Sequence, residues 1–268
     1  MKIHLSGPNR SILLIALFIP LIILSGCRPE SKKIPSSILA VFAHPDDEIY
    51  VAPLLSKYAR LGAAVNLIIV TDGRYGPGES GLPVGQELVE LRKEELSCAA
   101  TTLGINEPIS LGYHDQLKMQ EGLGVHVHYA RKLIRELDSL VLLLAPDILI
   151  TWGPDGGTNH PDHRLVGVSL AHVFLSRKQG PKKLYFVGTP TAQLSKEDQL
   201  LHGVDKRFLT THIEFDSTDL KNTAAALHCY RSQFSKARIE ERIQKMNENE
   251  PVIYLRQLLI SDRVNTHL

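Results

Sequence analysis

The chain has 268 residues, of which 43% are hydrophobic, so it is long and apolar enough to bury the core of one α/β domain. Its 30 lysines and arginines nearly balance its 29 aspartates and glutamates, and the formal net charge of +1 excludes a nucleic-acid partner held by overall charge. Twelve histidines are present, several of them beside acidic residues, a pattern that indicates metal chemistry.

The first 27 residues have the pattern of a secretory signal. Lys2 and Arg10 precede an apolar run over residues 11–24, which is short for a membrane-spanning helix. The run ends in the sequence LSGC, which resembles the lipobox of bacterial lipoproteins and implies that Cys27 carries a lipid. We therefore expect a protein of the cell envelope, anchored by lipid to a membrane outside the cytoplasm. An ordinary signal peptide or an uncleaved anchor is the alternative.

Residues 28–37 (RPESKKIPSS) are polar, contain two prolines and show no apolar period. Such a segment predicts a flexible tether. The remaining residues, 38–268, are expected to form a single folded domain, because their pattern indicates neither an internal repeat nor a second domain.

Predicted strands and helices alternate from residue 38 onward. Short continuous apolar runs indicate strands buried on both faces, and apolar residues spaced by three or four indicate helices. Strands are expected at residues 38–43, 64–71, 108–111, 147–152 and 183–187, with an edge strand at 212–215. Helices are expected at residues 46–61, 86–103, 125–144, 165–176, 218–234 and 236–246. This order predicts an α/β fold with a mostly parallel sheet and helices on both faces.

Two cysteines lie inside the expected domain. Cys98 and Cys229 both fall in predicted helices among apolar neighbours, which favours buried free thiols. A disulfide between them is the alternative, since a protein outside the cytoplasm can form one if the two Cα atoms approach closely enough.

The sequence AHPDDE, residues 43–48, directly follows the first expected strand. Ligands of an open parallel sheet bind beyond the carboxyl ends of its strands, so these side chains are well placed for a site. Pro45 restricts His44 to an extended conformation, and the two aspartates are expected in the first turn of a helix. His44 and Asp47 can then converge on one point, whereas Asp46 must point in another direction.

A second segment, NHPDH at residues 159–163, follows the strand expected to end near Trp152. His160 and His163 are three residues apart, so they share one helix face, and either can supply an imidazole to a metal held by His44 and Asp47. Two histidines and one carboxylate, with one position open, are typical of catalytic zinc. Iron(II) is the main alternative metal.

These two motifs are similar to the signatures of the LmbE-like, or PIG-L-type, zinc-dependent N-acetylglucosaminyl deacetylases. Weaker similarities lie at residues 71–73, 92–96, 111–115 and 227–233 (TDG, RKEEL, LGYHD and LHCYRSQ). The resemblance covers about residues 38–235 and implies a Rossmann-like three-layer α/β/α catalytic domain. It also implies removal of the N-acetyl group from an N-acetylglucosamine-type sugar or conjugate. The expected location at a membrane adds envelope glycans and glycolipids to the expected substrates. Arg74 departs from the acidic residue that many relatives carry at its position.

The resemblance implies a Zn²⁺ ion bound by residues matching His44, Asp47 and His163. Asp46 matches the general base that takes a proton from the metal-activated water. His160 matches the residue that stabilises the oxyanion or donates a proton.

Three further residues complete the expected site. Asp162 is expected to orient His160 and keep it protonated. Arg92 and Asp115 match positions that contact the sugar, although an ion pair on its own helix is the alternative for Arg92.

Two other functions fit the same residues. One is an amidase of the same family that cuts a larger acyl group from an amino-sugar conjugate, which would need a longer pocket beside the glycine-rich loop at residues 72–85. The other is a non-catalytic, lipid-anchored protein that binds carbohydrate or metal. Asp46 distinguishes an enzyme from a binding protein, because a binding protein does not need a carboxylate beside the metal.

Overall fold

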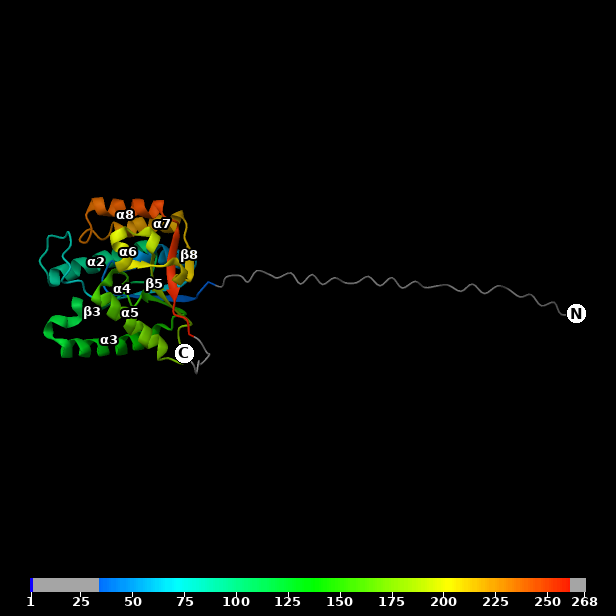
Figure 1. Cartoon of the computed structure of the whole chain (residues 1–268), viewed down its shortest axis with the longest axis horizontal. Coiled ribbons are helices and arrows are strands. Elements are labelled where there is room, and N and C mark those ends of the chain that lie inside the picture. The colour runs from blue at the N-terminus through cyan, green and yellow to red at the C-terminus, as the bar shows by residue number, and fades with distance from the viewer. Residues whose placement is uncertain (2–33, 261–268) are drawn as a thin grey trace. The chain divides into compact units, whose positions relative to one another are not determined.

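A sheet of seven strands lies between two layers of helices (Figure 1). The computed structural model describes Met1 and residues 34–260. The predicted signal, Cys27 and most of the predicted tether lie outside the described residues. Within residues 34–260, no helix is both long enough and apolar enough to cross a membrane.

The sheet is mostly parallel, as the sequence predicts. Its strands, in spatial order, are β3 (Ile109–Tyr113), β2 (Ala64–Thr71), β1 (Ser37–Phe42), β4 (Ile148–Trp152), β5 (Lys183–Val187), β9 (Val252–Gln257) and β8 (Thr211–Glu214). The first five are parallel to one another, whereas β9 pairs antiparallel with both β5 and β8. A separate two-stranded sheet pairs β6 (Thr189–Pro190) with β7 (Gly203–Val204).

Helices cover both faces of the large sheet (Figure 1). The longer ones are α1 (Ala52–Arg60), α2 (Gln86–Leu103), α3 (Leu123–Leu144), α5 (Pro161–Leu175), α7 (Ser217–Leu227) and α8 (Lys236–Glu248). The shorter ones are α4 (Gly156–Asn159), α6 (Lys196–His202) and the 3-10 segments η1 (Asp47–Val51), η2 (Asp115–Glu121), η3 (Thr191–Gln193) and η4 (Lys206–Phe208).

The apolar run of β1 supplies two cores at once, because successive side chains of a strand point to opposite faces. Ile38, Ala40 and Phe42 pack in the core that contains residues of α1, α2, α7 and α8. Leu39 and Val41 pack in the core that contains residues of α3 and α5. Burial on both faces explains why this strand has a continuous apolar sequence rather than an alternating one.

Two predicted helices differ from the structure, and one strand of the large sheet was not predicted. The helix expected from residue 46 begins instead with η1, because Asp46 has a φ of 108°, outside the helical region. The helix expected over residues 218–234 ends at Leu227 and is followed by a turn. Strand β9 was not predicted, although its sequence, VIYLRQ, opens with four consecutive apolar residues.

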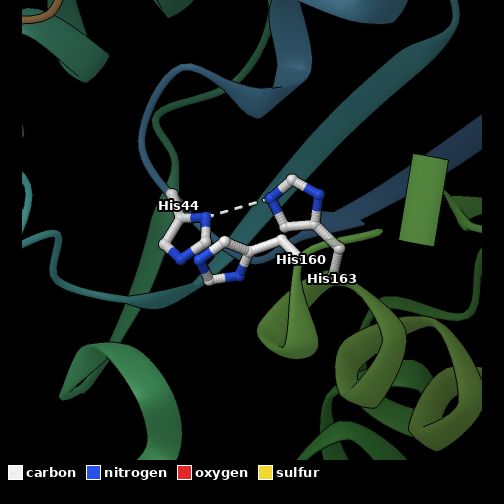
Figure 2. A group of neighbouring side chains, drawn as sticks. All are labelled: His44, His160 and His163. Atoms are coloured by element: carbon white, nitrogen blue, oxygen red, sulfur yellow. Dashed lines mark hydrogen bonds between the residues drawn. The ribbon is translucent and has the colours of Figure 1, made fainter. Parts of the chain in front are cut away.

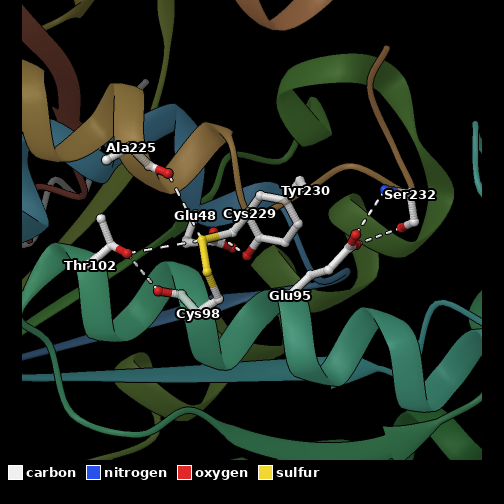
Figure 3. Close-up of a disulfide and its surroundings, with 8 residues drawn as sticks. All are labelled: Glu48, Glu95, Cys98, Thr102, Ala225, Cys229, Tyr230 and Ser232. Carbon is white, nitrogen blue, oxygen red and sulfur yellow. Dashed lines mark hydrogen bonds between the residues drawn. A yellow bond between two sulfur atoms is a disulfide. The ribbon is translucent and has the colours of Figure 1, made fainter. Parts of the chain in front are cut away.

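Cys98 and Cys229 form a disulfide, so the prediction of free thiols is wrong (Figure 3). Cys98 lies in α2, and Cys229 follows the end of α7, which packs beside α2 on one face of the sheet. This packing brings the two Cα atoms to 5.9 Å, within the range that a disulfide spans. The pattern of helical spacing within each segment carries no information on which helices become neighbours.

Removal of this disulfide is expected to destabilise the protein, because the bond restricts a loop with a sequence separation of 131 residues in the unfolded chain. The double variant Cys98→Ala/Cys229→Ala should lose about 2–5 kcal/mol of unfolding free energy in urea denaturation. Dithiothreitol should lower the midpoint of the wild type toward that of the variant and leave the variant unchanged. Equal midpoints for wild type and variant would contradict the disulfide's stabilising role.

Candidate active site

The two histidine-containing segments meet because β1 and β4 are neighbouring parallel strands. Strands β2 and β3 lie on one side of β1, and β4 and β5 lie on the other, so the strand order reverses between β1 and β4. Such a switch point is where ligands bind in open α/β sheets. Residues 43–48 follow β1, and the segment that leads to residues 160–163 follows β4. Both therefore reach the same edge of the sheet.

His44, Asp47 and His163 come together as the sequence predicts. His163 Nε2 lies 3.1 Å from His44 Nδ1 and 3.2 Å from Asp47 Oδ1, and His44 Nδ1 lies 3.7 Å from Asp47 Oδ2. Ligand atoms of a tetrahedral zinc site lie about 2.0–2.2 Å from the ion, which places them about 3.4 Å from one another. The three side chains therefore fit one divalent ion with two nitrogen ligands and one oxygen ligand.

His160 lies beside this group. Nitrogen atoms of His44, His160 and His163 all lie within 4.8 Å of one another, and Figure 2 shows the three rings converging. The His160 side chain is 43% exposed, whereas those of His44 and His163 are 13% and 6% exposed. Its Nδ1 accepts a hydrogen bond from the backbone N–H of Asp162 at the start of α5. The neutral ring then carries its proton on Nε2.

Asp162 orients His44 rather than His160, which corrects the prediction. Its Oδ2 lies 3.2 Å from His44 Nε2 and accepts a hydrogen bond of 2.7 Å from the backbone N–H of Gln116. The same oxygen is 3.9 Å from His160 Nδ1, beyond hydrogen-bond distance. A carboxylate on the second nitrogen of a histidine is the usual support of a metal ligand. The closeness of His160 and Asp162 in the sequence gave no sign that Asp162 would contact His44 instead.

The other two candidate ligands are also fixed by neighbours. His163 Nδ1 lies 3.0 Å from the Gly156 carbonyl oxygen, which leaves Nε2 directed at the group. Asp47 Oδ2 accepts bonds from the backbone N–H groups of Ala43 and His44 and from Trp152 Nε1. Trp152 also stacks on the His163 ring, with centroids 4.6 Å apart and planes inclined by 2°. Trp152, whose role the sequence left open, therefore supports the site from within the core.

The charges of these groups are strongly coupled. Burial alone would lower the pKa of His44, but the hydrogen bonds and charges of Asp162 and Asp47 outweigh it and raise this pKa to about 10. Burial also opposes ionisation of Asp47, yet the nearby His163 and His44 hold its pKa well below the usual range. The ionised carboxylates of Asp47 and Asp162 therefore favour a positive charge between them. A divalent cation can supply this charge with neutral imidazoles and an ionised carboxylate as its ligands.

Asp46 lines a cavity of about 300 Å³ that His44, Asp47 and His163 also line. Its carboxylate lies 3.4 Å from the guanidinium of Arg92, a side chain of α2 that is only 4% exposed. Burial raises the pKa of Asp46 to about 6, while Arg92 acts in the opposite direction. Asp46 is therefore a carboxylate placed beside the candidate ion and held by a buried cation.

Arg92 and Asp115 line the same cavity, and both also bind the backbone around it. Arg92 donates to the carbonyl oxygens of Gly73 and Pro45. Asp115 accepts from the backbone N–H groups of Gly73 and Tyr75. Neither residue is a solvated surface charge, which removes the alternative of an ion pair on the Arg92 helix. Together they hold the start of the 72–85 loop against the site.

The loop position after the second strand requires glycine. Gly73 has a φ of 74°, and a Cβ atom placed on it would lie 2.5 Å from Arg92 Nη1. The cavity is also lined by Tyr75, Gln116 and Gln233. Gln116 was not predicted as a site residue; it precedes Leu117 and Lys118 in a run of three positive φ angles that the sequence does not signal.

The fold and the site define a family. The PIG-L family model, described as GlcNAc-PI de-N-acetylase, matches residues 39–174, which are 136 of the 268 residues. This match covers just over half of the chain and both histidine motifs. The chain belongs to the PIG-L family.

Named relatives fit this membership. A 1D-myo-inositol 2-acetamido-2-deoxy-α-D-glucopyranoside deacetylase from Nakamurella multipartita is 34% identical over 182 residues, 56% of this chain and 59% of the relative. The chain spans about three fifths of the length of the curated relatives that it matches first.

Solved structures share the fold. N,N'-diacetylchitobiose deacetylase from Pyrococcus horikoshii has a TM-score of 0.62 and 18% identity, with 84% of each chain covered. GalB, a 4-carboxy-2-hydroxymuconate hydratase from Pseudomonas putida, also has a TM-score of 0.62, with 14% identity over 87% of this chain and 99% of its own. The fold is therefore found in proteins named for different reactions, so the reaction has to be argued from the site.

Replacing His163 by alanine is expected to abolish tight binding of Zn²⁺, because the change removes the atom closest to both other candidate ligands. His160→Ala should retain the ion, since His160 lies outside that set of three. Metal per chain is measured by mass spectrometry after loading with Zn²⁺ and dialysis. His172→Ala, at an exposed position of the same helix, is the control. Retention by His163→Ala together with loss from His160→Ala would reverse the assignment.

Proposed function

We propose that this protein is a zinc-dependent hydrolase that removes the N-acetyl group from an N-acetylglucosamine-type sugar or conjugate. The position of Asp46 carries the proposal. Its carboxylate lines the cavity next to His44, Asp47 and His163, but its ion pair is with Arg92. A binding site needs no such carboxylate, whereas hydrolysis needs a base for water. The printed names of relatives, among them the inositol-linked deacetylase of Nakamurella multipartita, support an acetylated amino sugar as substrate.

His44, Asp47 and His163 are the residues that would hold the ion. When bound, Zn²⁺ acidifies water and polarises a carbonyl group. Two nitrogen ligands favour zinc, and Fe²⁺ is the alternative metal for the same set. The hydrogen bond of Asp162 to His44 and the stacking of Trp152 on His163 keep the two imidazoles in place.

The proton transfers follow from the two groups beside the ligands. Asp46 takes a proton from the attacking water, whose oxygen adds to the acetyl carbonyl carbon. His160 donates a hydrogen bond from Nε2 to the carbonyl oxygen as negative charge develops there. The carbon–nitrogen bond then breaks, the nitrogen receives the proton held by Asp46, and acetate and a free amine are released.

Asp115 and Arg92 are proposed as sugar contacts at the cavity wall. Each oxygen of Asp115 already accepts one backbone N–H bond, and a carboxylate can accept further bonds from sugar hydroxyls. Arg92 is more committed, because its two terminal nitrogens bind carbonyl oxygens and Asp46. Its main role in this proposal is to hold Asp46 toward the cavity.

Asp46→Asn is expected to lower kcat by about 10²- to 10⁴-fold, since it removes the base and keeps the shape of the side chain. The zinc content of the variant should remain that of the wild type. Acetate release is measured from N-acetylglucosamine linked to inositol, to malate and to a second sugar, with and without a chelator. Near-normal turnover by Asp46→Asn would contradict its assignment as base.

The same assay distinguishes the two other functions. N-acyl substrates with longer chains would be cut faster than the acetyl compounds if the protein were an amidase for larger groups. Binding of these sugars without release of any acid by the zinc-loaded wild type would indicate a binding protein.

We propose further that the protein is lipid-anchored at Cys27 and works outside the cytoplasm, on amino sugars of the cell envelope. The LSGC sequence supports the anchor. The Cys98–Cys229 disulfide supports the location, because such bonds persist in oxidising compartments and are rare in the cytosol.

Replacement of Cys27 by serine tests the anchor. In a bacterial host fed an alkyne-tagged fatty acid, the full-length wild type is expected to carry the label and to sediment with membranes. The Cys27→Ser variant should carry none, because the lipid is attached through the thiol. Labelling of the variant at the wild-type level, or an unlabelled wild type, would contradict the proposal.

A further inference from the structure

Asp46 holds a backbone conformation that needs support. Its φ of 108° and ψ of −15° are unusual for a residue with a side chain, and such angles persist only where the surroundings hold them. The backbone N–H of Asp46 donates to Glu48 Oε2 at 3.2 Å. Glu48 therefore accepts a bond from the peptide group whose conformation sets the direction of the Asp46 side chain.

Glu48 is itself held from the far end of the chain. Its side chain is fully buried, and its other oxygen, Oε1, accepts a hydrogen bond of 2.5 Å from the hydroxyl of Tyr230. Tyr230 is also fully buried. A continuous path thus runs from the Tyr230 hydroxyl through both oxygens of Glu48 to the backbone of Asp46.

Helix α2 holds both ends of this path. At the Tyr230 end, Cys98 of α2 is bonded to Cys229, the neighbour of Tyr230 in sequence (Figure 3). Glu95 of α2 accepts bonds of 2.8 and 2.6 Å from the backbone N–H and the hydroxyl of Ser232. Arg92, on the same helix, pairs with Asp46. Helix α2 therefore holds two things in place: the segment that contains Tyr230, and the carboxylate of Asp46.

The candidate metal ligands do not use this path. Asp47 is held by Ala43, His44 and Trp152, and His163 by the carbonyl of Gly156. A role in core packing alone does not explain Glu48, because burial of a carboxyl group among apolar side chains is costly and leucine would fill a similar volume. The path leads instead to the residue proposed as the base.

We propose that Glu48 and Tyr230 are positioning residues that hold Asp46 in the orientation required for proton transfer, without contributing to metal binding. This inference rests on the proposed hydrolysis and identifies two residues on which its rate depends. Neither residue touches the substrate; both act through the backbone of Asp46.

Kinetics of four variants test the proposal. The double variant Glu48→Leu/Tyr230→Phe replaces both partners by apolar groups, which is expected to leave stability nearly unchanged. Its kcat should fall by about 10- to 100-fold, because a small displacement of a catalytic group costs that much, while KM and zinc content stay at wild-type values. Tyr230→Phe alone should lower kcat less than the double variant does.

Two variants serve as controls. Glu48→Gln keeps an acceptor oxygen for the Asp46 N–H and a polar partner for Tyr230, so it should recover most of the kcat lost in the double variant. Tyr254→Phe removes the hydroxyl of another buried tyrosine, which lies in β9 and donates to Glu250, and should leave kcat unchanged. A double variant with wild-type kcat would overturn the proposal. So would a loss of kcat matched by loss of zinc or by a lower urea midpoint, since either marks a structural role.

A crystal structure of the double variant separates this inference from the proposed function. The inference predicts that Asp46 leaves its positive φ while His44, Asp47 and His163 keep their positions. An unchanged Asp46 would overturn it. If the wild type releases no acid from any substrate, the proposed function fails, and the position of Asp46 in the variant still decides the positioning role.

Discussion

The approach of His44, Asp47 and His163 to within 3.1–3.7 Å of one another is the interaction on which the site depends. Parallel pairing of β1 with β4 brings the two segments together, and the two cores hold the strands in register. Buried carboxylates lie beside imidazoles at this point, at the end of an apolar strand. A divalent cation held by the three side chains would offset the cost of burying their charges.

Different residues hold the candidate metal ligands and the proposed base. Asp162, on α5, holds the His44 imidazole, and Trp152, on β4, holds the His163 imidazole. Arg92, on α2, holds the carboxylate proposed as the base. Because different elements carry the two supports, metal binding and proton transfer can be damaged independently. This separation is what allows variants to distinguish ligand, base and positioning roles.

Regular elements follow from local pattern, and departures from it arise where distant parts of the chain meet. Strand β2, helix α2 and strand β5 have the predicted bounds, because a continuous apolar run or helical spacing between glycines specifies each of them. The three close candidate ligands could be predicted because strand ends of a parallel sheet share an edge. The positive φ of Asp46 could not, since it depends on Glu48 and on Tyr230, 182 residues further along the chain. The partner of Asp162 and the disulfide have the same long-range origin.

Membership of the PIG-L family limits the possible reactions more than the fold does. The fold alone is shared by a protein named as a hydratase and one named as a deacetylase. Differences within the family are expected at the 72–85 loop. There Asp72 pairs with Arg74, and Asp115 anchors the turn by accepting from Gly73 and Tyr75. Tyr75 of this loop lines the site cavity, whereas Arg74 lines a separate pocket with Asp72.

Anomalous diffraction at the zinc edge from crystals of the metal-loaded protein tests the central claim most directly. The account predicts one strong peak at about 2.0–2.2 Å from His44 Nδ1, an Asp47 oxygen and His163 Nε2, with the Asp46 carboxylate facing the ion but not bound to it. A peak elsewhere, no peak after loading, or an ion bound directly by Asp46 would contradict the account.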